Sequence, residues 1–124
     1  FIGKRIEEIS TGIAKSHGAD AKVQFDLVNK YPPTINHKNQ SIFASKVAKD
    51  LVGDTNVITD IDPSMGGEDF SFLLNEKPGA YLYIGQKDKN HSAHLHTTKY
   101  DFNDNLSPIG VNYWVKLVQH FFQK

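Results

Sequence analysis

The chain has 124 residues, with 14 basic and 14 acidic side chains and no cysteine. A formal charge of zero argues against nucleic acid or an anionic membrane as the main partner, because both are bound through clustered positive charge. The absence of cysteine excludes disulfides and thiolate metal sites within this segment.

The start of the chain does not look like the start of a translated protein. Its first residue is Phe1, and its only methionine is Met65. No signal-peptide pattern opens the sequence, and no apolar run is long enough to span a bilayer. We therefore expect this chain to be the end of a longer protein.

The first third of the chain predicts a helix, a strand and a break. Isoleucines recur at four-three-four spacing over residues 2–17, which is typical of an amphipathic helix, and Gly18 ends it. Apolar and polar side chains alternate over residues 21–28, the period-two pattern of a half-buried strand. Tyr31-Pro32-Pro33 then stops regular structure, because proline fixes φ and lacks a donor. The prolines mark a domain boundary or hinge, with an ordinary strand-to-helix connection as the alternative.

The rest of the chain alternates between helical and extended patterns. Apolar spacing predicts helices at about 37–52, from Glu68 to Leu74, and near the C-terminus, where Ser107 would cap and Pro108 would come first. Strands are expected at 57–61 and 80–84. This order predicts an α/β (α+β mixed) fold, in which ligands bind beyond the carboxyl ends of the strands. The loops 62–69 and 85–105 each follow a strand and could meet there.

A histidine-rich run follows the second of these strands. Residues 91–104 hold three of the six histidines and two aspartates. In an extended backbone the rings of His94 and His96 would point to the same side. Neutral imidazole is the commonest protein ligand for zinc-like metals, but such a centre needs three or four protein groups. The run can therefore supply one ligand without completing a site. The alternative is a polar surface loop.

Two glycines precede the short helix that begins near Glu68. The backbone N–H groups of Gly66 and Gly67 are unobstructed and could hold a carboxylate or phosphate with help from the helix dipole. A tight turn that needs positive φ is the alternative explanation.

Three motifs taken together resemble one family. They are Tyr31-Pro32-Pro33-Thr34-Ile35-Asn36, Ser64-Met65-Gly66-Gly67-Glu68-Asp69-Phe70, and Leu95-His96 followed by Tyr100-Asp101-Phe102-Asn103-Asp104. Their order and spacing resemble the C-terminal part of zinc-dependent amidohydrolases of the metallopeptidase type. These include hippurate hydrolase, N-acyl-amino-acid amidohydrolases and auxin-conjugate hydrolases, and, more distantly, aminoacylase and carboxypeptidase G.

The resemblance implies a two-metal catalytic domain that is interrupted by a lid domain, which commonly forms the dimer. Residues 1–33 would be the last helix and strand of this lid (dimerisation) domain, and residues 34–124 the C-terminal part of the catalytic domain. The whole protein would hydrolyse the amide bond of N-acyl or N-aroyl amino acids. It would be a cytoplasmic homodimer, with no nucleic-acid or membrane partner.

The resemblance also assigns residues. His96 matches the last metal ligand, for zinc or alternatively manganese or cobalt. Gly66, Gly67 and Glu68 match the loop at the carboxylate end of the substrate, and Asn36 lies near where the lid reaches the site. The other ligands and the general base lie upstream in the family, so this segment holds no catalytic residue. Its metal site is incomplete, and the remainder of its own chain is a necessary partner. We expect the segment alone to be inactive.

Two other functions compete with this one. The chain could be a non-catalytic dimerisation or assembly module, whose strand at 21–28 pairs with a partner. It could instead be a self-contained metal-binding domain that uses His91, His94 and His96, although three ligands so close in sequence would strain tetrahedral geometry.

Overall fold

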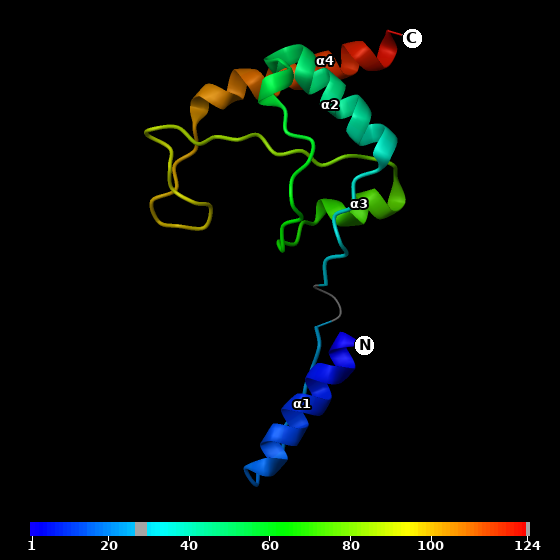
Figure 1. The fold of residues 1–124 in the computed structure, drawn as a ribbon, viewed down its shortest axis with the longest axis vertical. Helices are drawn as coiled ribbons and strands as arrows, with labels where there is room; N and C mark the ends of the chain where they lie inside the picture. Colours follow the sequence, from blue (N-terminus) through cyan, green and yellow to red (C-terminus); the bar gives the residue numbers. More distant parts are fainter. Residues whose placement is uncertain (27–29, 124) are drawn as a thin grey trace. The chain divides into compact units, whose positions relative to one another are not determined.

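Within the described residues, the regular structure is helical throughout (Figure 1). The computed structural model describes residues 1–26 and 30–123. Its elements, in chain order, are α1 (Ile2–Ser16), α2 (Lys38–Val52), η1 (Asp54–Asn56), α3 (Phe70–Glu76), η2 (Asp104–Leu106) and α4 (Ser107–Phe122). All four predicted helices are present close to their expected bounds. No strand forms within the described ranges, so the predicted α/β (α+β mixed) class is wrong.

The predicted strands are absent because they have no neighbours to pair with. A strand satisfies its backbone N–H and C=O groups through an adjacent strand, and none lies beside 57–61 or 80–84 in the part of the chain that is described. Val57 does take an extended conformation, with φ −117° and ψ 114°. Of the predicted strand 21–28, residues 21–26 are irregular, and Leu27 and Val28 lie outside the described residues.

The chain divides into two compact units, Phe1–Lys30 and Tyr31–Lys124. In the first unit α1 ends in a glycine cap of the Schellman type. Gly18 (φ +70°) donates its N–H to the Lys15 carbonyl at 3.0 Å, and Ala19 donates to the Ala14 carbonyl at 2.9 Å. The prediction that Gly18 ends this helix is confirmed. The helix carries a row of exposed isoleucines at positions 2, 6, 9 and 13.

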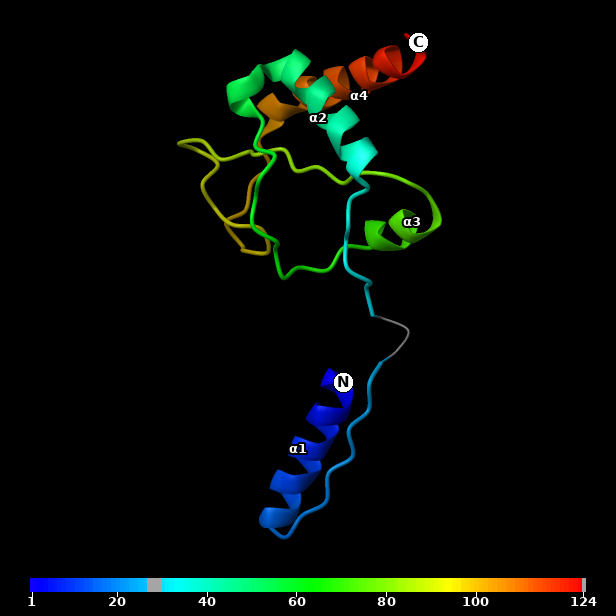
Figure 2. The same ribbon diagram turned by 45° about the vertical axis from the view of Figure 1, so that its right-hand side comes forward.

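In the second unit α2 and α4 pack side by side (Figures 1 and 2). Val47 is fully covered in this packing, and the Tyr113 hydroxyl donates to the Ala44 carbonyl at 3.3 Å. Burial raises the pKa of Tyr113. At the exposed edge, Lys116 of α4 forms an ion pair with Asp50 of α2 at 2.7 Å. The two helices are therefore joined by both apolar and charged contacts.

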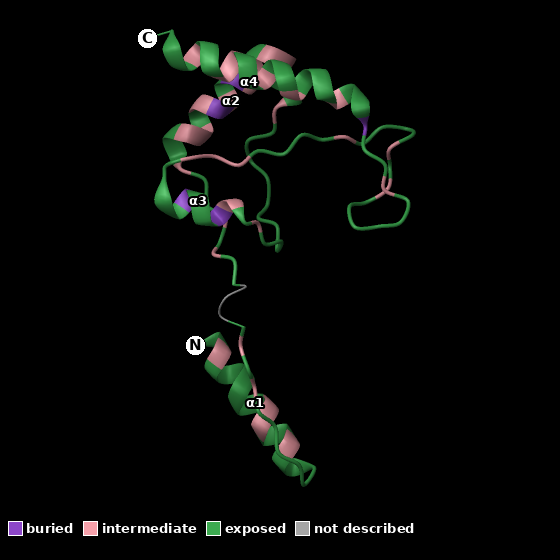
Figure 3. Cartoon of the chain, turned by 180° about the vertical axis from the view of Figure 1, so that it is seen from behind, coloured by how far each residue is buried: buried purple, intermediate pink, exposed green. Residues whose placement is uncertain are grey.

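The core of the described chain is small (Figure 3). Its buried residues are Ala44, Val47, Ser71, Leu74 and Asn103. Large apolar side chains remain exposed on α4, including Trp114 at 66% and Phe122 at 77%. Exposed apolar surface of this extent is typical of faces that pack against further protein.

The start of α4 differs from the prediction in one respect that matters for the site. Ser107 is the first residue of the helix rather than its cap, and no side chain caps α4. Instead, Asn103 caps the preceding η2 turn by accepting a hydrogen bond from the Asn105 N–H at 3.2 Å. None of the described helices is long and apolar enough to cross a membrane.

Candidate functional site

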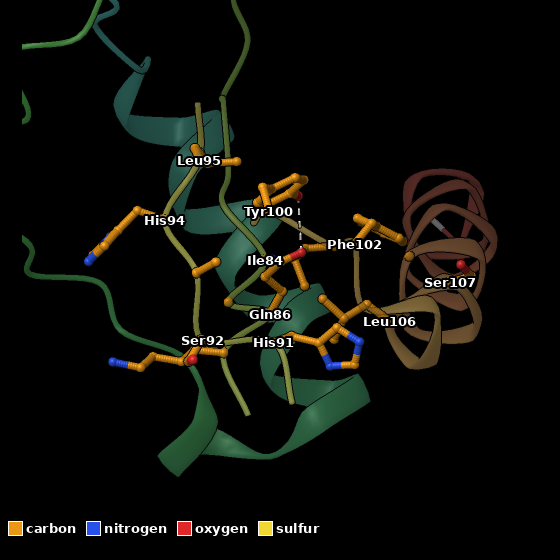
Figure 4. Close-up of a pocket in the computed structure, with 14 residues that line it drawn as sticks. Ile84, Gln86, His91, Ser92, His94, Leu95, Tyr100, Phe102, Leu106 and Ser107 are labelled. Carbon is orange, nitrogen blue, oxygen red and sulfur yellow. Dashed lines mark hydrogen bonds between the residues drawn. The ribbon is translucent and has the colours of Figure 1, made fainter. Parts of the chain in front are cut away.

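Three of the six histidines, His91, His94 and His96, lie on a loop that begins at Gln86 and ends at Asn103. We call residues 86–103 the histidine loop. Hydrogen bonds across its two ends close it. The Asn103 amide donates to the Gln86 carbonyl at 3.1 Å and to Asp88 Oδ2 at 3.0 Å. The Tyr100 hydroxyl donates to Gln86 Oε1 at 3.1 Å, as the dashed line in Figure 4 marks.

Asp88 also holds a turn at residues 88–91 within this loop. Its Oδ1 accepts hydrogen bonds from the backbone N–H groups of Asn90 and His91, both at 2.8 Å, and lies 2.8 Å from His91 Nδ1. These bonds, those from His91 foremost, lower the pKa of the Asp88 carboxyl below its ordinary value. The carboxylate form of Asp88 is therefore the one that fits this turn.

His96 occupies an unusual backbone conformation at the tip of the loop. Its φ is 61°, and it is the one described residue other than glycine with positive φ. Positive φ occurs in only a few per cent of residues other than glycine, with Asn, Asp and His enriched among them, and it clusters at functional sites. Two hydrogen bonds flank it, from Thr97 Oγ1 to the His94 carbonyl at 2.9 Å and from the Tyr100 N–H to the Thr97 carbonyl at 3.1 Å. The His96 side chain is exposed.

The three histidines of the loop do not converge. Figure 4 shows the rings of His91 and His94 pointing away from each other. Among the described residues, no group of three or more histidine, cysteine, aspartate or glutamate side chains is placed to hold a metal ion. The chain thus offers single imidazole donors, and three or four protein ligands would be needed to hold zinc.

A pocket of about 450 Å³ opens beside the histidine loop (Figure 4). Its wall is mostly apolar and is formed by residues 84–85, the histidine loop and the start of α4. It includes Ile84, Leu95, Tyr100, Phe102, Leu106 and Gly110. His91 and His94 contribute polar groups to the same wall.

The glycine loop (residues 62–69) is limited by packing at Gly67 and is hydrogen-bonded at its end, where the Glu68 carbonyl accepts from the Ser71 N–H at 3.1 Å. Tyr31 lies so close to Gly67 that a Cβ there would come within 3.1 Å of the Tyr31 ring. The same ring lies 5.9 Å from that of Phe72 on α3, centroid to centroid. Neither Gly66 nor Gly67 has positive φ, so close approach explains the glycine at 67 better than a strained turn does.

Glu68 and Asn36 both meet Tyr81. The Asn36 side chain accepts a hydrogen bond from the Tyr81 N–H at 2.7 Å and donates to its carbonyl at 2.9 Å. Burial, followed by the charge of Glu68 and a hydrogen bond with it, raises the pKa of the Tyr81 phenol. The structure therefore gathers three of the predicted substrate residues, Gly67, Glu68 and Asn36, around two tyrosines. No hydrogen bond, ion pair or ring contact within the described ranges links them to His96.

Sequence reasoning missed the residues that support these loops. Asn103 belongs to the Tyr-Asp-Phe-Asn-Asp run, but its position there gives no sign that it is buried. Gln86 and Asp88 belong to no periodic pattern, so no sequence signal marks them. Tyr31 and Tyr81 are visible in the sequence only as a hinge residue and a strand residue.

Comparison with known proteins assigns nearly all of the chain to one protein family. Residues 3–120 match the family described as peptidase family M20/M25/M40. The chain is 32% identical over 120 residues to hippurate hydrolase of Campylobacter jejuni. The aligned region covers 97% of the chain and 30% of that relative. The chain is 30% identical over 124 residues to an IAA-amino acid hydrolase (ILR1-like 5) of Arabidopsis thaliana, covering 97% of the chain and 28% of the relative.

A third relative has a different named substrate. The chain is 33% identical over 120 residues to N-acetyldiaminopimelate deacetylase of Lacticaseibacillus casei, again covering 97% of the chain and 30% of the relative. The chain thus spans less than a third of the length of these curated relatives. No solved structure matches it significantly.

Proposed function

The chain belongs to peptidase family M20/M25/M40, and we propose that it is part of a metal-dependent amidohydrolase that cleaves the amide bond of N-acyl or N-aroyl amino acids. The family is one of metal-dependent hydrolases, and the resemblance read from the three sequence motifs is thereby confirmed. Relatives named for hippurate, for IAA-amino acids and for N-acetyldiaminopimelate all point to an acylated amino acid as the substrate class.

The observation that carries this proposal is the backbone of His96. A histidine in the left-handed region costs of order 1–3 kcal/mol and persists only where the surroundings hold it. Here it is exposed and flanked by hydrogen bonds at the loop tip. Its ring is free of hydrogen-bond partners among the described residues, so a lone pair is available to a metal.

The donor set of the chain fits a shared metal site, not a complete one. His96 would supply one zinc ligand, with manganese or cobalt as alternatives, and the other ligands would come from the rest of the protein. A divalent metal polarises the scissile carbonyl and makes a bound water more acidic. The general base also lies outside this chain in our proposal, so this chain binds and orients rather than transferring protons.

The glycine loop would receive the carboxylate of the amino acid. The backbone N–H groups of Gly66 and Gly67 can donate to it. Both residues are exposed, whereas Glu68 is half-buried and turned to Tyr81. Asn36 spends both ends of its amide on the Tyr81 backbone, so its contribution would be to hold Tyr81 beside Glu68.

The test uses the full protein that contains this chain. It would be stripped with a chelator and assayed for release of benzoate from hippurate, before and after zinc is restored. We expect the hydrolysis to depend on zinc and to fall sharply for hippurate methyl ester, which lacks the carboxylate. Hydrolysis that survives metal removal, or no hydrolysis of any N-acyl amino acid in a panel, would refute the proposed function.

The isoleucine row of α1 favours a second role, in dimerisation. Ile2 is 72% exposed and Ile13 58% exposed, on one face of an amphipathic helix. A homodimer that covers this face would fit an assembly module as well as an enzyme. Sedimentation of the full protein with Ile6 and Ile9 changed to serine would test this role, and an unchanged dimer would exclude this face as the interface.

A further inference from the structure

We propose that Gln86, Asp88, Tyr100 and Asn103 form a clamp that fixes the histidine loop in a metal-binding conformation, so that Asn103 is a positioning residue for His96. This inference rests on the proposed function, because it takes His96 to be a metal ligand. The four residues are called the loop clamp below.

Every polar group of the Asn103 side chain is hydrogen-bonded. Asn103 is 5% exposed. Its amide nitrogen donates both hydrogens, to the Gln86 carbonyl and to Asp88 Oδ2, while its Oδ1 accepts from the Asn105 N–H. A buried amide with every group paired is costly to replace, since any change leaves a neighbouring polar group without its partner.

The loop clamp reaches the turn that holds His96. The Tyr100 N–H bonds the Thr97 carbonyl, immediately after His96, while its hydroxyl bonds Gln86 Oε1. Asn103 then links Gln86 to Asp88. A continuous set of hydrogen bonds therefore runs from the tip of the loop to its two ends.

The loop clamp also lowers the free-energy cost of ordering the loop when metal binds. A long loop without such ties samples many conformations, and a ligand on it must be ordered when the metal binds. Ordering the loop in advance removes that cost from metal binding. The positive φ of His96 also indicates a loop that is held in place, because a loop without these hydrogen bonds would relax to a less costly backbone conformation.

The experiment measures zinc affinity of the full protein by competition with a chromogenic chelator. Asn103→Asp keeps the size of the side chain but sets an oxygen against the Gln86 carbonyl and the Asp88 carboxylate. Asp88→Asn keeps an oxygen for the Asn90 and His91 N–H groups but sets one amide nitrogen against another. We expect each single change to weaken zinc binding by about tenfold or more.

The double variant supplies the decisive readout. In Asp88→Asn with Asn103→Asp, the donor and acceptor are exchanged, so their hydrogen bond can form again. We expect zinc affinity to recover by several-fold relative to Asn103→Asp alone, a coupling that general loss of stability would not produce. Asn56→Ala is the matched control, because it also removes an asparagine amide that donates to a backbone carbonyl, that of Val52 at 2.7 Å. It should leave zinc affinity unchanged.

The outcomes separate the two proposals. Wild-type zinc affinity in Asn103→Asp, alongside loss of zinc in His96→Ala, would overturn the clamp and leave the proposed function standing. Retention of zinc in His96→Ala would overturn both the clamp and the assignment of His96 as a metal ligand, while hydrolysis of N-acyl amino acids would still test the proposed function separately. If Asn103→Asp fails to fold, Asp88→Asn and the milder Tyr100→Phe decide. Unchanged zinc affinity in both of these variants would overturn the clamp.

Discussion

The two candidate loops of this chain are built in opposite ways. The histidine loop is closed by side-chain hydrogen bonds that involve a buried asparagine and an aspartate with a lowered pKa. The glycine loop has no comparable network among the described residues and is limited by the Tyr31 ring that packs on Gly67. Side-chain hydrogen bonds join the two ends of the histidine loop, whereas close packing limits the glycine loop at Gly67.

This difference matches what each loop would have to do. A metal ligand must be held within a narrow geometry before the metal arrives. Backbone donors to a carboxylate need only an open approach, which glycine provides. The comparison predicts that hydrogen bonds order the histidine loop in advance, and that the position of the glycine loop depends on the packing of Tyr31 against Gly67.

The most severe test of this division is the activity of the 124-residue chain alone. Because a single imidazole cannot hold a catalytic metal, we expect the isolated 124-residue chain, with both loops present, to show no zinc-dependent hydrolysis of hippurate. A purified 124-residue chain would be assayed at several concentrations. Benzoate release in proportion to the concentration of the chain would show that it carries a complete site.

Hydrogen exchange in the full protein would compare the loops directly. The Asn90 and His91 N–H groups are bonded to Asp88, so at neutral pH they should exchange about tenfold more slowly than those of Gly66 and Gly67, after correction for intrinsic rates. Because the pKa of Asp88 is lowered in the folded chain, this protection should persist at moderately acidic pH and be lost as the pH falls through that pKa. Equal exchange in the two loops would remove the distinction.

A pair of alanine substitutions tests the packing of the glycine loop. A Cβ at Gly67 would lie 3.1 Å from the Tyr31 ring, whereas one at Gly66 would meet nothing nearer than the Ser64 hydroxyl at 3.9 Å. We expect Gly67→Ala to raise the KM of the full enzyme for an N-acyl amino acid by roughly 3- to 10-fold, because the donors are displaced. Gly66→Ala serves as the control and should change KM little. A larger effect at Gly66 would contradict the packing argument.

The smallest expected effect lies away from both loops, in the α2–α4 pair. Lys116 and His120 lower the pKa of Asp50, so their interaction stabilises the fold above the ordinary pKa of the carboxyl and is lost as the pH falls through the lowered value. Asp50 is exposed, so Asp50→Asn should lower the thermal midpoint of the full protein by only about 1–3 °C at pH 7. The two proteins should converge once the pH has fallen below the lowered pKa of Asp50. A difference that persists there would assign the effect to something other than charge.

The sequence predicted the helices well and the sheet wrongly, for a physical reason. A helix satisfies its backbone internally, so the spacing of isoleucines and the glycine at position 18 were sufficient for α1. A strand depends on another strand, and residues 57–61 and 80–84 have none beside them in the described chain. Periodicity shows which side chains are suited to burial, but it does not show whether an adjacent strand is present.

The sequence likewise identified some residues of the candidate site and missed others. His96 and the glycines were identifiable because they sit in motifs that resemble a known family. The loop clamp was not, because Gln86, Asp88 and Asn103 acquire their role only when the two ends of a loop meet. Side chains that act through long-range hydrogen bonds leave no period in the sequence.

If the imidazole of His96 is a metal ligand, its removal should abolish zinc binding by the full protein. His96→Ala removes the ring and keeps the backbone cost, whereas His96→Gly removes the ring and relieves that cost. We expect both variants to lose zinc affinity by more than about 100-fold, together with hydrolysis. Zinc content and activity at wild-type levels in both variants would contradict the assignment.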